Sequence, residues 1–208
     1  GVARMSIAKQ LHGELEATQL SAWEEEIDLL QAALCEVAGW IYLEFDVPRL
    51  GSRIDAVVVS GPAVLPIEFK CGEQRFSAEA FHQAWDYGLD LKNFHRASHG
   101  AAIFPVLVAT GAERVGQDWQ LPYSDGVRPP RRTASSELAE AIRGALALVD
   151  GGDLDGEAWG RSPYHPTPTI VEAARALYAR HSVEAITRND AGAVNLRVTS
   201  GAVEEIID

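Results

Sequence analysis

The fold is decided by the stretch from residue 53 to residue 70, which reads RIDAVVVSGPAVLPIEFK. Two apolar runs flank the turn Ser60-Gly61-Pro62, and a turn of this kind between short runs rich in valine predicts a hairpin. One strand is therefore expected from Arg53 to Val59 and the next from Val64 to Lys70. The Ala-Val-Val-Val end of the first run predicts burial on both faces of a sheet.

The residues before this hairpin predict a helix and a further strand. Ser21 and Glu24 match an S-x-x-E capping box, and apolar residues recur behind it at helical spacing. A helix is therefore expected from Ser21 to about Gly39. Residues 41–47 alternate between apolar and polar, which predicts a half-buried strand. Because short turns join antiparallel neighbours, the three strands are expected to form an antiparallel meander.

The residues after the hairpin predict a helix from Ser77 to His95 and a fourth strand from Ile103 to Thr110. A helical crossover favours parallel pairing of that strand with the third one. A polar, proline-rich loop is expected over 111–133 and a helix over 135–149. The fold class is thus expected to be α/β, a small sandwich of sheet and helices. We expect an N-terminal extension (1–20), the α/β domain (21–150), and an extended linker with helices (151–208).

Two prolines and a histidine qualify this prediction. Pro66 and Pro105 fall inside expected strands. Because proline has no backbone N–H to donate, we expect each of them at an edge or a bulge. His95 ends the expected helix, where a cationic imidazole interacts favourably with the helix dipole.

The composition is that of a soluble globular protein. Of 208 residues, 47% are hydrophobic and 23% charged, and no apolar stretch reaches the roughly 18 to 20 residues that a membrane span needs. Without a signal-peptide pattern, and with only two cysteines, the chain is expected to be cytoplasmic. Its 18 basic and 30 acidic residues give a net charge of −12, which argues against a general nucleic-acid binder. An enzyme that meets nucleic acid through a metal ion remains compatible with this charge.

Three ionisable residues mark the hairpin. Glu68 and Lys70 are two apart and point to the same face, while Asp55 on the neighbouring strand can reach the same end of the sheet. Two converging carboxylates suit Mg²⁺, and an ammonium beside them can orient water and balance charge on a reacting phosphate. The alternative is that Asp55 merely begins a strand and the other two form a surface pair. Against it, the pair interrupts an apolar run, where charge is costly unless it is used.

The two expected helices supply further candidates. Glu26 is the acid of the first helix that is best placed to face the sheet, as a third metal ligand or an organiser of ligands. The alternative for Glu26 is a solvated helix edge. Gln83 and Tyr87 are four apart on the second helix and share a face, where an amide and a phenol can hold a phosphate or a nucleic-acid backbone.

These segments together resemble a known family. Arg53-Ile54-Asp55, Ile67-Glu68-Phe69-Lys70 and Gln83-Ala84-Trp85-Asp86-Tyr87 resemble the PD-(D/E)xK nuclease superfamily, the last of them the Q-x-x-x-Y element of its RecB-like branch. More closely, residues 23–110 are similar to the nuclease-like domain that precedes the motor of bacterial Schlafen-type DNA/RNA helicases. Ile54 stands where the superfamily has proline. The chain has no G-x-x-x-x-G-K-[ST] pattern, so no ATPase is expected in it.

The resemblance implies a restriction-endonuclease-like core and a metal-dependent nuclease that acts on DNA, with RNA as the alternative substrate. It assigns Mg²⁺ or Mn²⁺ to Asp55, Glu68 and the backbone carbonyl of Phe69. Lys70 positions the attacking water, and Glu26 completes the acidic site.

The resemblance also assigns Gln83 and Tyr87 to the nucleic-acid strand being cut. It implies that this chain is the nuclease module of a larger helicase protein, covalently linked to the motor, with a role in repair or phage defence. The alternative is a catalytically inactive module of the same fold that binds nucleic acid or a protein partner. The net charge of −12 and the missing proline favour that alternative.

Overall fold

The computed structural model describes residues 4–7, 17–47 and 52–165. The chain divides into two compact units, residues 1–162 and residues 163–208. The first unit extends beyond the expected 21–150 domain at both ends, because it includes a strand at 4–7 and a short helix at 156–160. The helices expected within 166–208 lie outside the described residues. None of the described helices is long and apolar enough to cross a bilayer.

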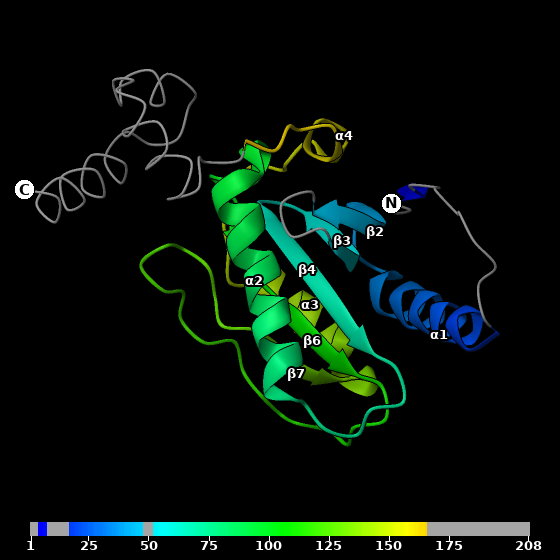
Figure 1. The fold of residues 1–208 in the computed structure, drawn as a ribbon. Helices are drawn as coiled ribbons and strands as arrows, with labels where there is room; N and C mark the ends of the chain where they lie inside the picture. Colours follow the sequence, from blue (N-terminus) through cyan, green and yellow to red (C-terminus); the bar gives the residue numbers. More distant parts are fainter. Residues whose placement is uncertain (1–3, 8–16, 48–51, 166–208) are drawn as a thin grey trace, which may run out of the picture. The chain divides into compact units, whose positions relative to one another are not determined.

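A mixed sheet runs through the first unit (Figure 1). Its strands lie in the order β1-β2-β3-β4-β6-β7, and β5 also pairs with β4. Their bounds are β1 (Arg4–Ile7), β2 (Trp40–Val47), β3 (Ser52–Ser60), β4 (Ala63–Lys70), β5 (Ala102–Ile103), β6 (Val106–Ala109) and β7 (Arg131–Ala134). The predicted antiparallel meander of β2, β3 and β4 is confirmed. The parallel pairing of β6 with β4, predicted from the crossover helix, is confirmed as well.

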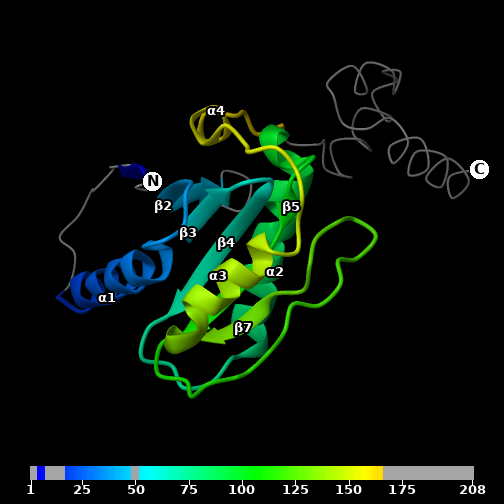
Figure 2. The ribbon, with the colours of Figure 1, turned by 180° about the vertical axis from the view of Figure 1, so that it is seen from behind.

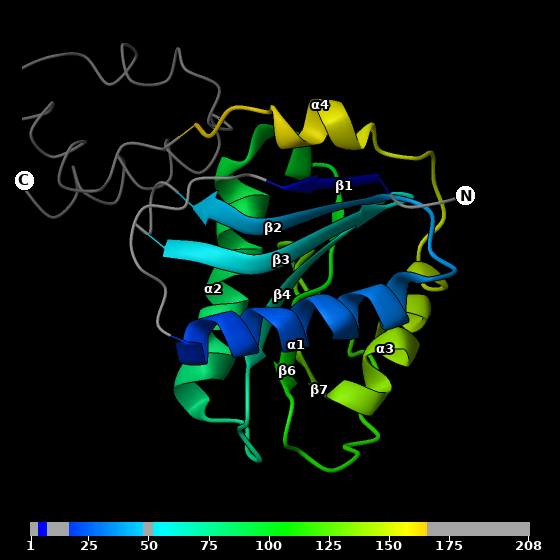
Figure 3. The ribbon, with the colours of Figure 1, turned by 90° about the vertical axis from the view of Figure 1, so that its right-hand side faces the viewer.

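Helices cover both faces of the sheet, which makes the fold α/β. The α-helices are α1 (Ala17–Leu34), α2 (Ala78–Phe94), α3 (Leu138–Leu146) and α4 (Gly156–Gly160), and two 3₁₀ turns are η1 (Arg96–Ser98) and η2 (Ser135–Glu137). Figure 3 shows α1 and α3 in front of the sheet and α2 behind it, and Figure 2 shows α3 in front of the sheet from another side. The crossover from β4 through α2 places α2 on the face of the sheet opposite α1 and α3, and Trp159 of α4 packs against Tyr42 of β2 on that same face.

Both faces of the sheet are apolar, as the valine-rich runs predicted. The main core joins one face to α1 and α3, and it includes Leu30, Leu65 and Ile142. A smaller cluster joins the other face to α2 through Ala80, Ala84 and Leu107. Any charged side chain on the central strands therefore has to find its partners at the ends of those strands.

The first helix begins earlier than predicted. α1 starts at Ala17, so Ser21 lies inside the helix and the prediction that Ser21 and Glu24 cap it was wrong. Alanine, glutamine and leucine form helix readily, and residues 17–20 contain all three, so nothing stops the helix from extending past Ser21 toward the N-terminus.

The expected fourth strand is divided into β5 and β6, and the two prolines lie at the division. β4 pairs with β5 at Ala63 and Val64, and with β6 from Ile67 onward. Pro66 lies on β4 beside this gap, and Pro105 lies between β5 and β6. An interrupted ladder is the arrangement that a residue without an N–H tolerates.

The loop expected over 111–133 ends in an unpredicted strand. β7 pairs in parallel with β6 at the edge of the sheet. Glu137 explains how the preceding loop is held, since its buried carboxylate accepts hydrogen bonds from the backbone N–H groups of Val115, Gly116 and Ala134. The sequence of β7, Arg-Arg-Thr-Ala, carries no alternation that could have revealed it.

His95 ends α2 as predicted, but it is not a cation. Its ring is fully buried, with Nδ1 2.7 Å from Ser98 Oγ and its centroid 4.4 Å from the ring of Trp159 on α4. Burial lowers the pKa of His95 to about 4, so the imidazole is neutral at pH 7. The expectation of a favourable charge at the helix end was therefore wrong.

Two helical glycines give a matched test of how closely α2 and α3 pack against their neighbours. A Cβ at Gly88 of α2 would lie 2.6 Å from Pro105 Cγ, so Gly88→Ala should push α2 off the sheet and lower the free energy of unfolding by about 1–3 kcal/mol. A Cβ at Gly144 of α3 would come no closer than 3.5 Å, to Trp119. Gly144→Ala should therefore keep that free energy or raise it by up to about 1 kcal/mol. Urea denaturation measures both, and the reverse order would contradict the packing.

Candidate active site

β3 and β4 separate at one end, and two carboxylates lie at the separation. The last paired residues are Ala56 and Ile67, so the next residues to face each other are Asp55 and Glu68. Asp55 Oδ2 accepts a hydrogen bond from the Phe69 N–H at 2.7 Å. The carboxylate therefore takes the place of a carbonyl group on the partner strand. The β3–β4 ladder begins at the hairpin turn and stops just before these two acids, so both lie at the end of the strands away from the turn.

An ammonium lies next to the carboxylates. Lys70 Nζ is 2.7 Å from Glu68 Oε1 and donates to Gln83 Oε1 at 3.2 Å. Gln83 Nε2 donates to the Tyr87 hydroxyl at 2.9 Å, and that hydroxyl donates to the Arg53 carbonyl at 2.9 Å. The chain of hydrogen bonds from α2 to β3 fixes the Gln83 amide with its oxygen toward Lys70.

The structure thus brings together all of the residues singled out on β3, β4 and α2, but it buries them to different extents. Tyr87 is only 2% exposed, and its hydroxyl is engaged within the protein. It acts on Lys70 through Gln83. Contact of Gln83 and Tyr87 with nucleic acid stays a prediction.

Burial dominates the electrostatics of the two facing carboxyls. It raises the pKa of Glu68 to about 8, with a further rise from Asp55 and an opposing effect of Lys70. Burial also raises the pKa of Asp55, against the hydrogen bond from Phe69. Burial alone would lower the pKa of Lys70, but the bond to Glu68 and the charge of Asp55 outweigh it, so the pKa is raised and the ammonium stays charged. Two such carboxyls resist ionising together unless a proton or a cation joins them.

Glu26 approaches the same place from α1. Burial raises its pKa to about 7, and the charge of Asp55 adds to the rise. The Cys71 thiol donates to Glu26 Oε1 at 3.5 Å. Burial, followed by the charge of Glu26, raises the pKa of Cys71 to about 12, so the thiol remains the donor. Glu26 is therefore an acid of the site that can exchange a proton near neutral pH.

The surroundings of Glu68 show whether a divalent cation fits the site. Its Oε2 is buried and has no hydrogen-bond partner among the described residues. A cation satisfies such an oxygen, and two carboxylates completed by water or backbone oxygens are ligands that Mg²⁺ accepts. Within the described ranges, no three carboxylate, imidazole or thiol side chains gather as a ligand set of their own. The fit rests on Asp55 and Glu68, while ligation by Glu26 and by the Phe69 carbonyl stays a prediction.

One residue that sequence reasoning missed lies beside this pair. The register of β2 on β3 places Glu44 opposite Asp55. Glu44 has φ 52°, and among the described residues it is the one non-glycine with a positive φ. Its Oε1 accepts from Trp23 Nε1 of α1 at 3.1 Å, and its Oε2 lies 3.2 Å from Arg53 Nε. The charge of Glu44 also contributes to the raised pKa of Asp55 and of Glu26.

No signal in the sequence could have distinguished Glu44. It occupies a polar position in the alternating run 41–47, as Tyr42 and Asp46 do. Its left-handed backbone follows from partners on α1 and β3, which are far away in the sequence.

A scan of family models, a search of curated proteins and a search of solved structures each gave no match to this chain. A functional assignment therefore has to rest on the geometry of the site.

The backbone of Glu44 predicts an unusual order of stabilities. Glu44→Gly and Glu44→Ala remove the same carboxylate, but glycine adopts φ 52° without strain. The glycine variant should therefore have a free energy of unfolding about 1–2 kcal/mol higher than the alanine variant. At Asp46, on the same strand, the alanine variant should be the more stable one. Urea denaturation of the four variants measures these free energies. If the alanine variant is the more stable one at both positions, the backbone at position 44 is not strained.

The raised carboxyl pKa values predict a pH dependence of stability without divalent cations. The pKa of Glu26 is about 7 and that of Glu68 about 8, both above the ordinary value of 4.5. The folded chain therefore binds more protons than the unfolded chain, and its free energy of unfolding falls as the pH rises through these values. Glu68→Gln should flatten that fall, and the exposed substitution Glu157→Gln should not.

The measurement is urea denaturation in EDTA between about pH 6.5 and pH 9. Below that range His95, whose pKa is lowered to about 4, gives a slope of the opposite sign. An equal slope in wild type and Glu68→Gln would mean that Glu68 is an ordinary, ionised surface acid.

Proposed function

We propose that this chain is a divalent-metal-dependent nuclease that hydrolyses phosphodiester bonds of DNA, with RNA as the alternative substrate. The observation that carries the proposal is the buried Glu68, with Asp55 facing it and Lys70 Nζ at 2.7 Å. The order of elements supports it too: a helix, an antiparallel meander, a crossover helix and a parallel strand suit a restriction-endonuclease-like core.

Asp55 and Glu68 would hold Mg²⁺ or Mn²⁺, with the Phe69 carbonyl and Glu26 as the further ligands to test. The metal, when bound, supplies a Lewis acid for a phosphate oxygen and lowers the pKa of a bound water. Two observations support this assignment: Glu68 Oε2 has no partner among the residues that the structure describes, and the pair resists joint ionisation. Metal binding by such a pair displaces protons from the carboxyls.

Lys70 would position the reacting groups. An ammonium has three N–H donors, and the structure uses two of them, toward Glu68 and Gln83. The third can donate to the attacking water or to a phosphate oxygen. Since the Lys70 side chain is about one-third exposed, a substrate can reach it. Glu26, with a pKa of about 7, can take up or release a proton at neutral pH.

The setting of the activity is proposed from the resemblance of residues 23–110 to Schlafen-type helicases. In that setting the chain is the nuclease module of a larger, cytoplasmic helicase protein and acts on DNA in phage defence or repair. The net charge of −12 is compatible with such an activity only if the site holds nucleic acid through a metal ion and local cations rather than through a broad basic surface.

Cleavage of labelled DNA tests the proposal. In Mn²⁺ or Mg²⁺, the wild-type chain should cut a labelled duplex or single strand, and EDTA should stop the reaction. Lys70→Ala and Asp55→Asn should each lower the rate by at least about 100-fold, because each removes a group that stabilises charge at the reacting phosphate. Labelled RNA in the same assay decides the substrate preference.

Matched controls come from the far end of the sheet. Asp153→Asn and Arg161→Ala change the same charges at exposed positions and should leave cleavage unchanged. Cleavage that survives both Lys70→Ala and Asp55→Asn would come from another site or another protein. Nucleic-acid binding without any cleavage would favour the inactive module.

A further inference from the structure

Arg53 lies at the edge of the same site, two residues before Asp55 on β3. Ile54, between the two, is fully buried. The Arg53 side chain is 56% exposed. It is therefore a cation that solvent, and hence a substrate, can reach.

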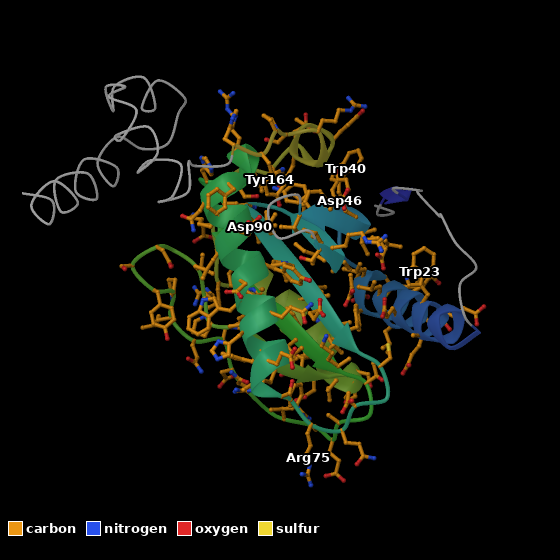
Figure 4. The ribbon with its side chains drawn as sticks, viewed as in Figure 1. Trp23, Trp40, Asp46, Arg75, Asp90 and Tyr164 are labelled. Carbon is orange, nitrogen blue, oxygen red and sulfur yellow. The ribbon has the colours of Figure 1, made fainter. Side chains whose placement is uncertain are left out.

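The guanidinium is paired with Glu44, and only part of its donor capacity is used. Asp46 is the residue directly across from Arg53 in the β2–β3 register and is labelled in Figure 4. The ion pair nevertheless runs diagonally, from Arg53 Nε to Glu44 Oε2 at 3.2 Å. Glu44 lies opposite Asp55 in the same register, so the diagonal pair draws the guanidinium along the strands to the level of Asp55. Its terminal N–H groups have no other partner among the described residues, and a guanidinium has five N–H donors in all.

Glu44 is itself held from two sides. Trp23, which projects from α1 in Figure 4, donates its indole N–H to Glu44 Oε1 at 3.1 Å. The backbone at Glu44 has φ 52°, which costs a non-glycine residue about 1–2 kcal/mol. Strained backbone is retained where the surrounding structure and function require the side chain in one place. Here that place is next to Arg53 Nε.

We propose that Arg53 binds a phosphate of the nucleic-acid strand beside the bond that is cut, and that Glu44 is the positioning residue that aims it. The inference rests on the proposed function. A phosphodiester approaching Glu26, Glu44, Asp55 and Glu68 meets four acids, so a nearby cation has to offset their charge. Arginine donates to phosphate oxygens in pairs, and Glu44 leaves the outer edge of the guanidinium available for this.

The test measures binding and cleavage separately. Binding of a fluorescein-labelled DNA duplex is followed by anisotropy in Mg²⁺ at several salt concentrations, in a Lys70→Ala background that keeps the probe intact. Each phosphate contact contributes about 0.9 to the slope of log K against log salt. Adding Arg53→Ala should lower that slope by about 0.9, and adding Arg161→Ala, the matched exposed arginine, should not change it. An unchanged slope with Arg53→Ala would overturn the proposal.

In an otherwise wild-type chain, Arg53→Ala should slow cleavage about 10- to 100-fold, as expected for the loss of a hydrogen bond to a charged group. Arg53→Lys should recover only part of this, because a lysine keeps the charge but not the paired donors. If wild type does not cleave but the salt slope still depends on Arg53, the proposed nuclease fails while the phosphate contact stands.

The role of Glu44 is tested by its dependence on Arg53. Glu44→Gln should lower the salt slope and the cleavage rate when Arg53 is present, and should add nothing when Arg53 is alanine. Asp46→Asn removes the same charge from the position directly across from Arg53 and should have little effect. A loss of Mn²⁺ affinity on adding Glu44→Gln to Arg53→Ala would instead make Glu44 a metal ligand and overturn its positioning role.

Discussion

The Phe69 N–H donates to the Asp55 carboxylate instead of to a carbonyl of the neighbouring strand, and the site depends on this replacement. A backbone donor inside a sheet needs a partner, and Asp55 supplies it at 2.7 Å where β3 and β4 separate. The same hydrogen bond holds the Asp55 carboxylate opposite Glu68. Lys70, two residues further on, then reaches the same face with its ammonium 2.7 Å from Glu68. A local break in the ladder thus collects three ionisable side chains in an otherwise apolar sheet.

The side chains at this break suit the binding of a cation, and they lower the stability of the folded chain. Glu68 is 3% exposed, and one of its oxygens has no hydrogen-bond partner within the described part of the chain, while Glu44 keeps a left-handed backbone within a strand. Both features cost folding free energy, which the rest of the sheet, where β3 and β4 are nearly all buried and apolar, can supply. A bound cation would relieve the first cost, and Arg53 and Trp23 offset part of the second.

The sequence was most informative where patterns are local. The valine-rich runs predicted the meander and the crossover helix predicted a parallel strand, because period and turn chemistry act over a few residues. The spacing of Asp55, Glu68 and Lys70 was readable for the same reason. What the sequence could not indicate depends on distant partners: β7, which lies beside β6, and the strain at Glu44, which requires Trp23 and Arg53.

The most direct test is calorimetric titration of Mn²⁺ into the wild-type chain at pH 7, repeated in two buffers of different ionisation enthalpy. If Asp55 and Glu68 share one cation, the ion should bind with release of about one proton, because carboxyls with raised pKa values have to ionise to receive it. Asp55→Asn and Glu68→Gln should each abolish that binding. Binding that is unaltered in both variants, or that releases no proton, would contradict a metal centre at the end of β3 and β4.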